Sequence, residues 1–115
     1  MKRDMELIRG LLFEFEGETK PDLSKWTEEQ KLYHAALLIE AGLLRGEVIH
    51  DSQGKIATAI IYRLTWEGHE FLDAARDETV WKKVRDKLET VGTNVALPLL
   101  VSLLTDFTKQ KLGIK

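Results

Sequence analysis

The sequence predicts a mixed α+β fold that is mostly helical, and three observations support this prediction. Apolar residues recur at helical spacing near the N-terminus, over residues 28–41 and again after residue 77. A glycine at position 42 separates the second helical segment from two strand-like stretches joined by a tight turn. The chain of 115 residues has the length of one domain, and its hydrophobic fraction of 43% is ordinary for a globular protein.

The first predicted helix covers residues 4–15, where apolar side chains repeat at helical spacing from Met5 to Phe15. Gly17 is expected to end this helix, and the polar stretch GETKPDLSK that follows is predicted to be a loop. Only about ten residues separate this helix from the next one, too few for a further helix and a turn.

The second predicted helix starts at Thr27, which forms a capping box with Gln30. Gly42 is predicted to adopt the left-handed conformation that ends this helix. One arc of the helical wheel is apolar and is expected to face the core: Leu32, Ala35, Ala36, Ile39 and the following Leu43.

A hairpin is predicted next, with strands LLRGEVIH (residues 43–50) and IATAIIYRLT (residues 56–65) around the turn DSQGK. Apolar residues occupy both faces of the second strand, so we expect much of it to be covered on both sides. One face carries Ile56, Ile60, Tyr62 and Leu64, and the other carries Ala57, Ala59 and Ile61.

The C-terminal half is predicted to be helical throughout. Thr65 caps a short helix, WEGHEFLDAAR, and Asp77 caps another with an apolar stripe from Val80 to Val91. A final helix is expected from about residue 94 to residue 112. We expect a single domain, 1–115, with a core of residues 1–76 and a helical extension of residues 77–115.

Two strings resemble segments of bacterial winged-helix repressors. HAALLIEAGLL (residues 34–44) is similar to the end of their recognition helix. YRLTWEGHEFL (residues 62–72) is similar to the passage from the wing into the next helix, where a Leu-Thr-x-x-Gly pattern is common. Over nearly its full length, the sequence also resembles a family of small bacterial and prophage proteins of unknown function that share LTWEGHEFLDAARDETVW.

The resemblance implies a winged helix-turn-helix-like core with an abbreviated second helix and a two-stranded wing, followed by two C-terminal helices. Such a fold implies double-stranded DNA as a partner and a small transcriptional regulator as the function. It implies no activity, cofactor or catalytic residue. The candidate DNA contacts are Gln30, Lys31 and His34 on the helix, Arg45, Lys55 and Arg63 on the wing, and Lys82 and Lys83 in the basic ridge WKKVRDK.

The charge distribution favours an alternative, a protein-interaction module on the same scaffold that does not bind DNA. Residues 1–43 hold six Lys and Arg against nine Asp and Glu, and the net charge of the chain is −2. Glu28 and Glu29 lie at the helix tip that would enter the groove of DNA. Leu37 and Leu38, predicted to face outward, are the candidate protein contacts on this helix.

The C-terminal segment predicts self-association, because eight of the ten residues in VALPLLVSLL are apolar. We expect a homodimer through this helix, with Leu99, Leu100, Leu103 and Phe107 as candidate contacts. The alternative is a monomer in which the last two helices fold back over the first helix and the hairpin. The stretch is about half the length of a membrane span, and no signal peptide is recognisable, so a cytoplasmic protein without a membrane association is expected.

An enzymatic function is not expected. The chain has no cysteine, and its three histidines, at positions 34, 50 and 69, show no metal-ligand spacing. His69 with Glu70 or Asp73 is the best metal candidate, although a surface ion pair explains this cluster equally well. We therefore expect no catalytic residue, no metal and no cofactor.

Overall fold

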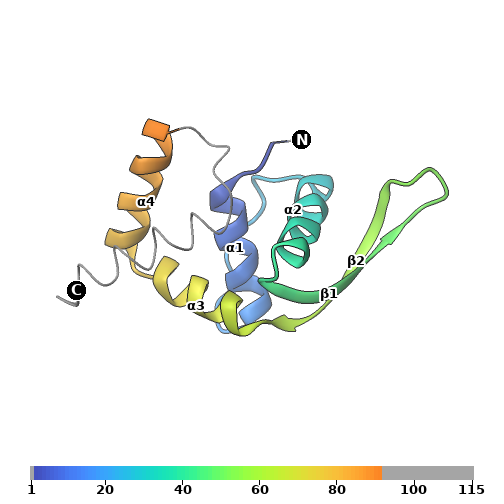
Figure 1. Cartoon of the computed structure of the whole chain (residues 1–115), viewed down its shortest axis with the longest axis horizontal. Coiled ribbons are helices and arrows are strands. Elements are labelled where there is room, and N and C mark those ends of the chain that lie inside the picture. Colours follow the sequence, from blue (N-terminus) through green and yellow to red (C-terminus); the bar gives the residue numbers. More distant parts are fainter. Residues whose placement is uncertain (1, 92–115) are drawn as a thin grey trace. The chain divides into compact units, whose positions relative to one another are not determined.

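The structure is a computed structural model that describes residues 2–91, with side chains through residue 87. Its elements follow the predicted order: helix, long connection, helix, hairpin and two further helices (Figure 1). The mixed, mostly helical α+β fold is therefore confirmed. By packing, the chain divides into two compact units, Met1–His69 and Glu70–Lys115. The division falls inside α3 (Trp66–Ala75), and the predicted boundary after residue 76 lies just beyond the end of that helix.

Helix α1 (Met5–Glu16) begins and ends with local signals in the sequence. The carboxylate of Asp4 accepts hydrogen bonds from the amides of Glu6 (3.0 Å) and Leu7 (3.2 Å), and so satisfies two free donors of the first turn. Gly17 ends the helix in the left-handed conformation, with φ of 85°. The face toward the core carries the buried residues Leu7, Ile8, Leu11 and Leu12.

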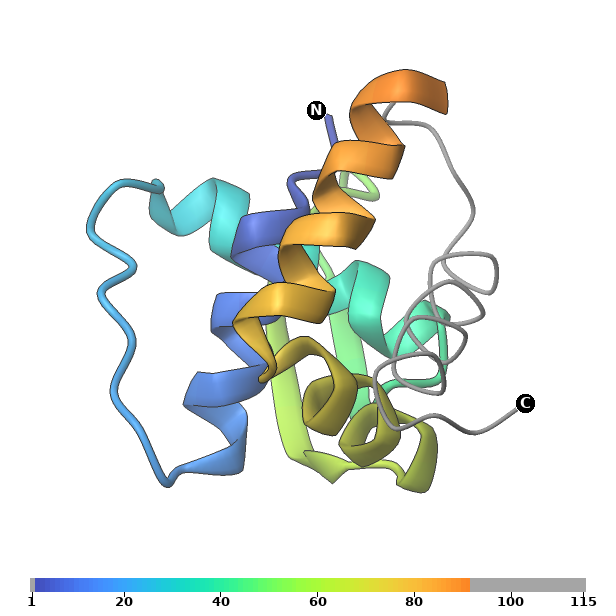
Figure 2. The ribbon, with the colours of Figure 1, turned by 90° about the vertical axis from the view of Figure 1, so that its left-hand side faces the viewer.

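No helix forms between α1 and α2 (Glu28–Glu40). Figure 2 shows the connection, residues 17–27, as a long loop that runs from the end of α1 to the start of α2. The prediction that the segment before Thr27 is too short to form a further helix is thereby confirmed.

Helix α2 starts with the predicted capping box. The Thr27 hydroxyl accepts from the Gln30 amide at 3.1 Å, while the Gln30 side chain accepts from the Thr27 amide at 2.8 Å. Gly42, with φ of 79°, ends the helical segment as predicted. Of the predicted core arc, Ala35, Ala36 and Leu43 are buried, whereas Leu32 and Ile39 are half-buried.

Strands β1 (Leu44–His50) and β2 (Ile56–Leu64) form the predicted antiparallel hairpin. Asp51 shapes the turn by accepting hydrogen bonds from the amides of Gln53 and Lys55. The register shifts twice, between Arg45 and Gly46 and between Ile49 and His50. Such bulges bend the ribbon and change which side chains share a face.

Thr65 connects the end of the hairpin to the start of α3. Its hydroxyl donates to the carbonyl of Gly42 at 2.6 Å and accepts from the amide of Gly68 at 3.0 Å, so it caps α3 as predicted. A Cβ atom on Gly68 would lie 2.0 Å from the carbonyl oxygen of Leu43. This close approach explains why the pattern Leu-Thr-x-x-Gly ends in a residue without a side chain.

In the second unit, Asp77 caps α4 (Glu78–Val91) by accepting from the amides of Thr79 and Val80. The side chains of Val80, Trp81 and Val84 are buried, and the ring of Trp81 meets that of Phe71 edge to face at 6.4 Å. The predicted final helix, residues 94–112, lies outside the described residues. None of the described helices has both the length and the apolar content to span a bilayer.

Candidate functional site

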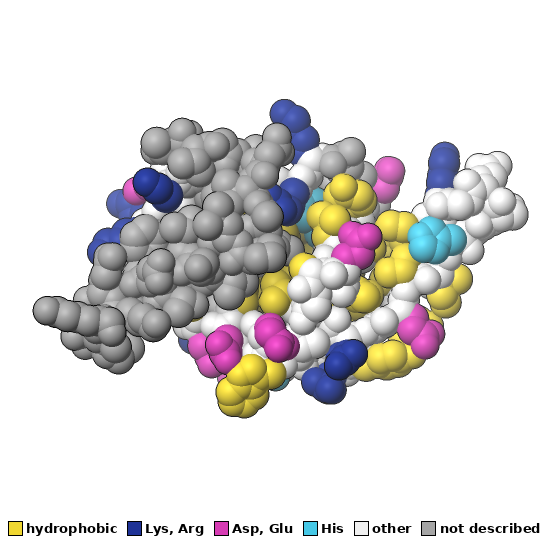
Figure 3. Space-filling model, viewed as in Figure 1, with side chains coloured by type: hydrophobic (Ala, Val, Ile, Leu, Met, Phe, Trp, Pro, Cys, Tyr) yellow, Lys and Arg dark blue, Asp and Glu magenta, His cyan; other side chains and the backbone are white. Residues whose placement is uncertain are grey.

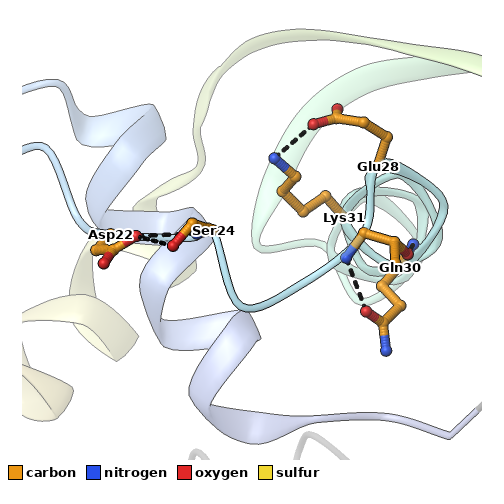
Figure 4. Close-up of polar contacts among 6 residues, drawn as sticks. Asp22, Ser24, Glu28, Gln30 and Lys31 are labelled. Carbon is orange, nitrogen blue, oxygen red and sulfur yellow. Dashed lines mark hydrogen bonds and ion pairs between the residues drawn. The ribbon is translucent and has the colours of Figure 1, made fainter.

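The first two candidate DNA contacts of α2 already have partners within the helix. The Gln30 side chain is part of the capping box, and the Lys31 ammonium group lies 2.7 Å from the carboxylate of Glu28 (Figure 4). Glu29 is exposed beside them. The exposed end of α2 therefore presents carboxylates, which the phosphate backbone of DNA repels.

The third candidate, His34, was predicted to face outward, and this prediction is wrong. Its side chain is 1% exposed and joins α2 to the start of α1. The ring atom Nε2 accepts a hydrogen bond from the Asp4 amide at 2.7 Å, and Nδ1 lies 2.7 Å from the carbonyl oxygen of Gln30, to which it donates. Trp26 donates its indole N–H to the carboxylate of Asp4 at 3.0 Å and completes this buried contact.

Leu38, one of the two predicted outward leucines of α2, is also buried, with no exposed surface. It lies one turn after His34, so both residues share the arc that packs in the core. Leu37 is half-buried. The prediction that Leu37 and Leu38 are outward-facing protein contacts is therefore wrong for Leu38. The arc of α2 that packs in the core is wider than predicted and includes Leu38.

The three cations of the wing are all exposed, but they lie in two places. Arg45 and Arg63 are directly opposite each other near the base of the hairpin, whereas Lys55 lies in the turn at its tip. Like charges opposite each other on a hairpin repel, so Arg45 and Arg63 favour an anionic or hydrogen-bonding partner between them. The guanidinium group of Arg63 also donates to the carbonyl of Leu64 at 3.0 Å.

One face of the hairpin carries large exposed apolar side chains that the sequence did not lead us to expect. Ile49 is 43% exposed, Ile60 is 42% exposed and Tyr62 is 61% exposed. The prediction that the second strand is covered on both sides is therefore wrong. The helices cover one face only, where Ala59 and Ile61 share a groove with residues of α1 and α2.

The exposed side chains belong to one surface, because Glu47 lies opposite Ile60 and Arg45 lies opposite Arg63. Tyr62 joins this surface through its hydrogen bond with Glu47. We name it the outer hairpin face, made of Arg45, Glu47, Ile49, Ile60, Tyr62 and Arg63. Figure 3 shows hydrophobic and charged side chains interleaved along the hairpin.

The charged side chains of this face are Glu47 and the two arginines. Desolvation, followed by the negative charge and the hydrogen bond of Glu47, raises the pKa of the Tyr62 phenol above its ordinary value of 10.0. Tyr62 is therefore neutral at physiological pH, and its hydroxyl group donates to the Glu47 carboxylate.

Trp66, at the start of α3, is 74% exposed and is a further exposed aromatic side chain of the first unit.

Several predicted site residues lie elsewhere in the chain. Lys82 and Lys83 are exposed on α4, as are Arg85 and Lys87, so the basic ridge is solvent-facing in the second unit. The candidate dimer contacts lie outside the described residues: Leu99, Leu100, Leu103 and Phe107. Among the side chains that the structure describes, those of residues 2–87, no group of three or more histidine and acidic side chains is arranged to hold a metal ion, and this includes His69 with Glu70 and Asp73.

The architecture defines a small, mostly helical α+β protein whose helix–hairpin–helix order is consistent with a winged-helix-like layout. Comparison with known proteins then places it in a family. The sequence pattern of the hypothetical protein family DUF2513 matches residues 2–94, and the chain belongs to this family.

An uncharacterised protein of Haemophilus influenzae is 31% identical to it over 120 residues, covering 98% of this chain and 100% of that protein. No solved structure matches the chain significantly. The predicted membership of a bacterial family of unknown function is thus confirmed.

Proposed function

We propose that the chain is a protein-interaction module on a winged-helix-like scaffold, and that its outer hairpin face binds a partner protein. The observation that carries this proposal is the exposure of Ile49, Ile60 and Tyr62 together on one face. Burial of a large apolar side chain from full exposure gains roughly 1.5–3 kcal/mol. These three side chains still expose about half of their surface, so each gains roughly half of that value when a partner covers it.

The composition of this face also supports a protein partner. Tyrosine and arginine are enriched among the residues that dominate binding energy at protein interfaces, and the face holds Tyr62 between Ile60 and Arg63. The two arginines outnumber the single carboxylate of Glu47, which is engaged with Tyr62. A complementary partner therefore presents apolar side chains next to a carboxylate.

Helix α2 also favours a protein partner over DNA, because few of its side chains are free to contact bases. Gln30 is held in the capping box, Lys31 pairs with Glu28, and His34 is buried. Base readout needs free donors and acceptors at the tip of the recognition helix, and this tip presents Glu28 and Glu29.

Site-specific photo-crosslinking in cells tests the proposal. A photoreactive amino acid at position 60 is expected to yield one discrete protein adduct, and the same amino acid at position 53 in the hairpin turn is the control. The protein identified in the adduct is then purified and titrated against the wild-type chain, Ile60→Asp and the matched control Gln53→Asp. We expect Ile60→Asp to weaken binding at least about tenfold, or 1.4 kcal/mol, and Gln53→Asp to leave it unchanged.

Two results would contradict this proposal. In the first, position 60 yields no adduct that position 53 does not also yield. In the second, the purified partner binds Ile60→Asp as tightly as the wild-type chain.

DNA association remains a second candidate, favoured by the exposed basic ridge of α4. A small regulator that contacts DNA through Lys82 and Lys83 would bind mixed-sequence duplexes without needing α2. Fluorescence anisotropy at about 50 mM salt tests this, because contacts to phosphates give a steep dependence on salt. Binding that the pair Lys82→Ala and Lys83→Ala abolishes would support it, and absence of binding at low salt would exclude it.

We also propose that the protein acts as a homodimer in the bacterial cytoplasm, through the apolar segment that contains Leu99 and Leu103. Its support is the sequence of that segment, in which eight of ten residues are apolar. Sedimentation velocity of the full chain and of the variant Leu103→Glu tests it. A wild-type chain that sediments as a monomer at all concentrations would exclude the dimer.

A further inference from the structure

A groove of about 400 Å³ lies where the C-terminal half of α1, the first half of α2 and the helix-facing side of β2 meet. It belongs entirely to the first unit. Six of its nine lining residues are apolar, and the other three are charged. The lining residues are Leu11, Glu14, Phe15, Glu28, Lys31, Leu32, Ala35, Ala59 and Ile61.

The groove is open because the connection between α1 and α2 does not fill it. None of residues 17–27 is among the residues that line it. Phe15, Leu32 and Ile61 are left half-buried in consequence, although each has the apolar character of a core residue. Half-buried apolar side chains around a hollow gain free energy when another apolar group fills it.

The charges among the lining residues are predominantly negative. Glu14 is exposed, and the side chain of Glu28 is 93% exposed. Lys31 is the one cation among the described lining residues, and it is partly buried and paired with Glu28 (Figure 4). Glu14 therefore has no compensating cation in the lining, and Glu29 adds a further exposed carboxylate next to Glu28.

We propose that this groove binds an amphipathic segment of a partner protein that carries apolar side chains next to lysine or arginine. The apolar lining residues contact the apolar side of such a segment, as in other complexes in which a helix lies in a groove. The cations then lie near the carboxylates of Glu14 and Glu28, so the charges are complementary. DNA is a poor occupant, because the same carboxylates repel phosphate.

This site is separate from the outer hairpin face. Ala59 and Ile61 line the groove, whereas Ile60 between them points to the opposite side of the strand. The two proposals therefore succeed or fail independently, and variants at neighbouring positions of β2 tell them apart.

The test uses a fluorescein-labelled synthetic helix in which leucine forms one face and lysine the other. The control peptide has glutamate at every lysine position. Fluorescence anisotropy with the full-length chain is expected to show binding of the lysine peptide and none of the glutamate peptide. Because part of the affinity is electrostatic, binding is expected to weaken as salt rises from about 50 mM to about 500 mM.

Two groups of variants locate the site. Ala59→Leu places a larger side chain in the groove, and Glu14→Lys with Glu28→Gln removes the complementary charge. We expect each change to weaken binding of the lysine peptide at least about tenfold. The matched controls are Gln53→Leu, in the hairpin turn, and Glu40→Lys, at the C-terminal end of α2, and both are expected to bind like the wild-type chain.

Three outcomes would overturn the proposal. The lysine peptide does not bind, the glutamate peptide binds equally well, or Glu40→Lys weakens binding as much as the double variant at positions 14 and 28. The charge variants concern exposed side chains, so they keep the test decisive if Ala59→Leu fails to fold. Failure here would leave the crosslinking result at position 60 unaffected.

Discussion

The hydroxyl group of Thr65 holds together three segments that are distant in the sequence. It donates to the carbonyl of Gly42 after α2 and accepts from the amide of Gly68 in the first turn of α3. The Thr65 amide in turn donates to the carbonyl of Leu43 at 3.1 Å. Replacing Thr65 with valine keeps the shape of the side chain and removes both hydrogen bonds of the hydroxyl group.

The expected loss follows from these two contacts. Removal of an N-cap acceptor costs about 1 kcal/mol. Loss of the second hydrogen bond, made by a residue that is 7% exposed, costs roughly a further 1–2 kcal/mol. We therefore expect Thr65→Val to lower the free energy of unfolding by about 2–3 kcal/mol, which corresponds to a melting temperature lower by roughly 10 °C for a chain of this length.

Thr65→Ser is the matched control, because serine keeps the hydroxyl group and loses one methyl group worth under about 1 kcal/mol. Urea denaturation followed by circular dichroism measures both variants against the wild-type chain. If valine and serine at this position give equal stability, the hydroxyl group does not connect the three segments, and the reasoning is refuted.

Three further predictions concern the junction, the buried histidine and the outer hairpin face. Gly68→Ala places a Cβ atom 2.0 Å from the Leu43 carbonyl oxygen and should cost about 1–3 kcal/mol in urea denaturation; wild-type stability would contradict this close approach. His34→Leu removes the acceptor of the Asp4 amide and should cost about 1–3 kcal/mol, with faster hydrogen exchange at the start of α1, whereas Tyr33→Phe should change neither. In a Tyr33→Phe background, ultraviolet titration should show Tyr62 deprotonating above pH 10.0, and Glu47→Gln should move the midpoint down. Because the pKa of Tyr62 is raised in the folded chain, its hydrogen bond with Glu47 stabilises the fold below pH 10.0, and this stabilisation is lost as the pH rises above 10.0. An unchanged midpoint in Glu47→Gln would contradict the role of Glu47 in raising this pKa.

The proposed functional surfaces were harder to predict from the sequence than the elements that carry them. Arg45 and Arg63 were predicted as candidate DNA contacts, but that they lie directly opposite each other depends on the register of the hairpin. Ile60 and Tyr62 were assigned to a covered strand, because an apolar pattern on both faces is typical of a buried strand. A two-stranded ribbon with helices on one face leaves the other face open, and the sequence contains no signal for this.

The groove was not predicted at all. Its lining residues come from three elements, and each of them looks like an ordinary core or surface residue in its own helix or strand. The missing helix between α1 and α2 was the one signal that pointed to unfilled space in this region.

Boundaries of helices and strands depend on a few neighbouring residues, and the amino-acid sequence was sufficient for them. Asp4, Thr27, Thr65 and Asp77 cap the helices α1 to α4 by bonding amides two or three residues away, and Gly42 ends α2 through its own backbone conformation. Burial depends instead on what lies opposite a side chain. His34 and Leu38 are buried, and Ile60 and Tyr62 are exposed, because packing between elements decides which arc of a helix or face of a strand is covered.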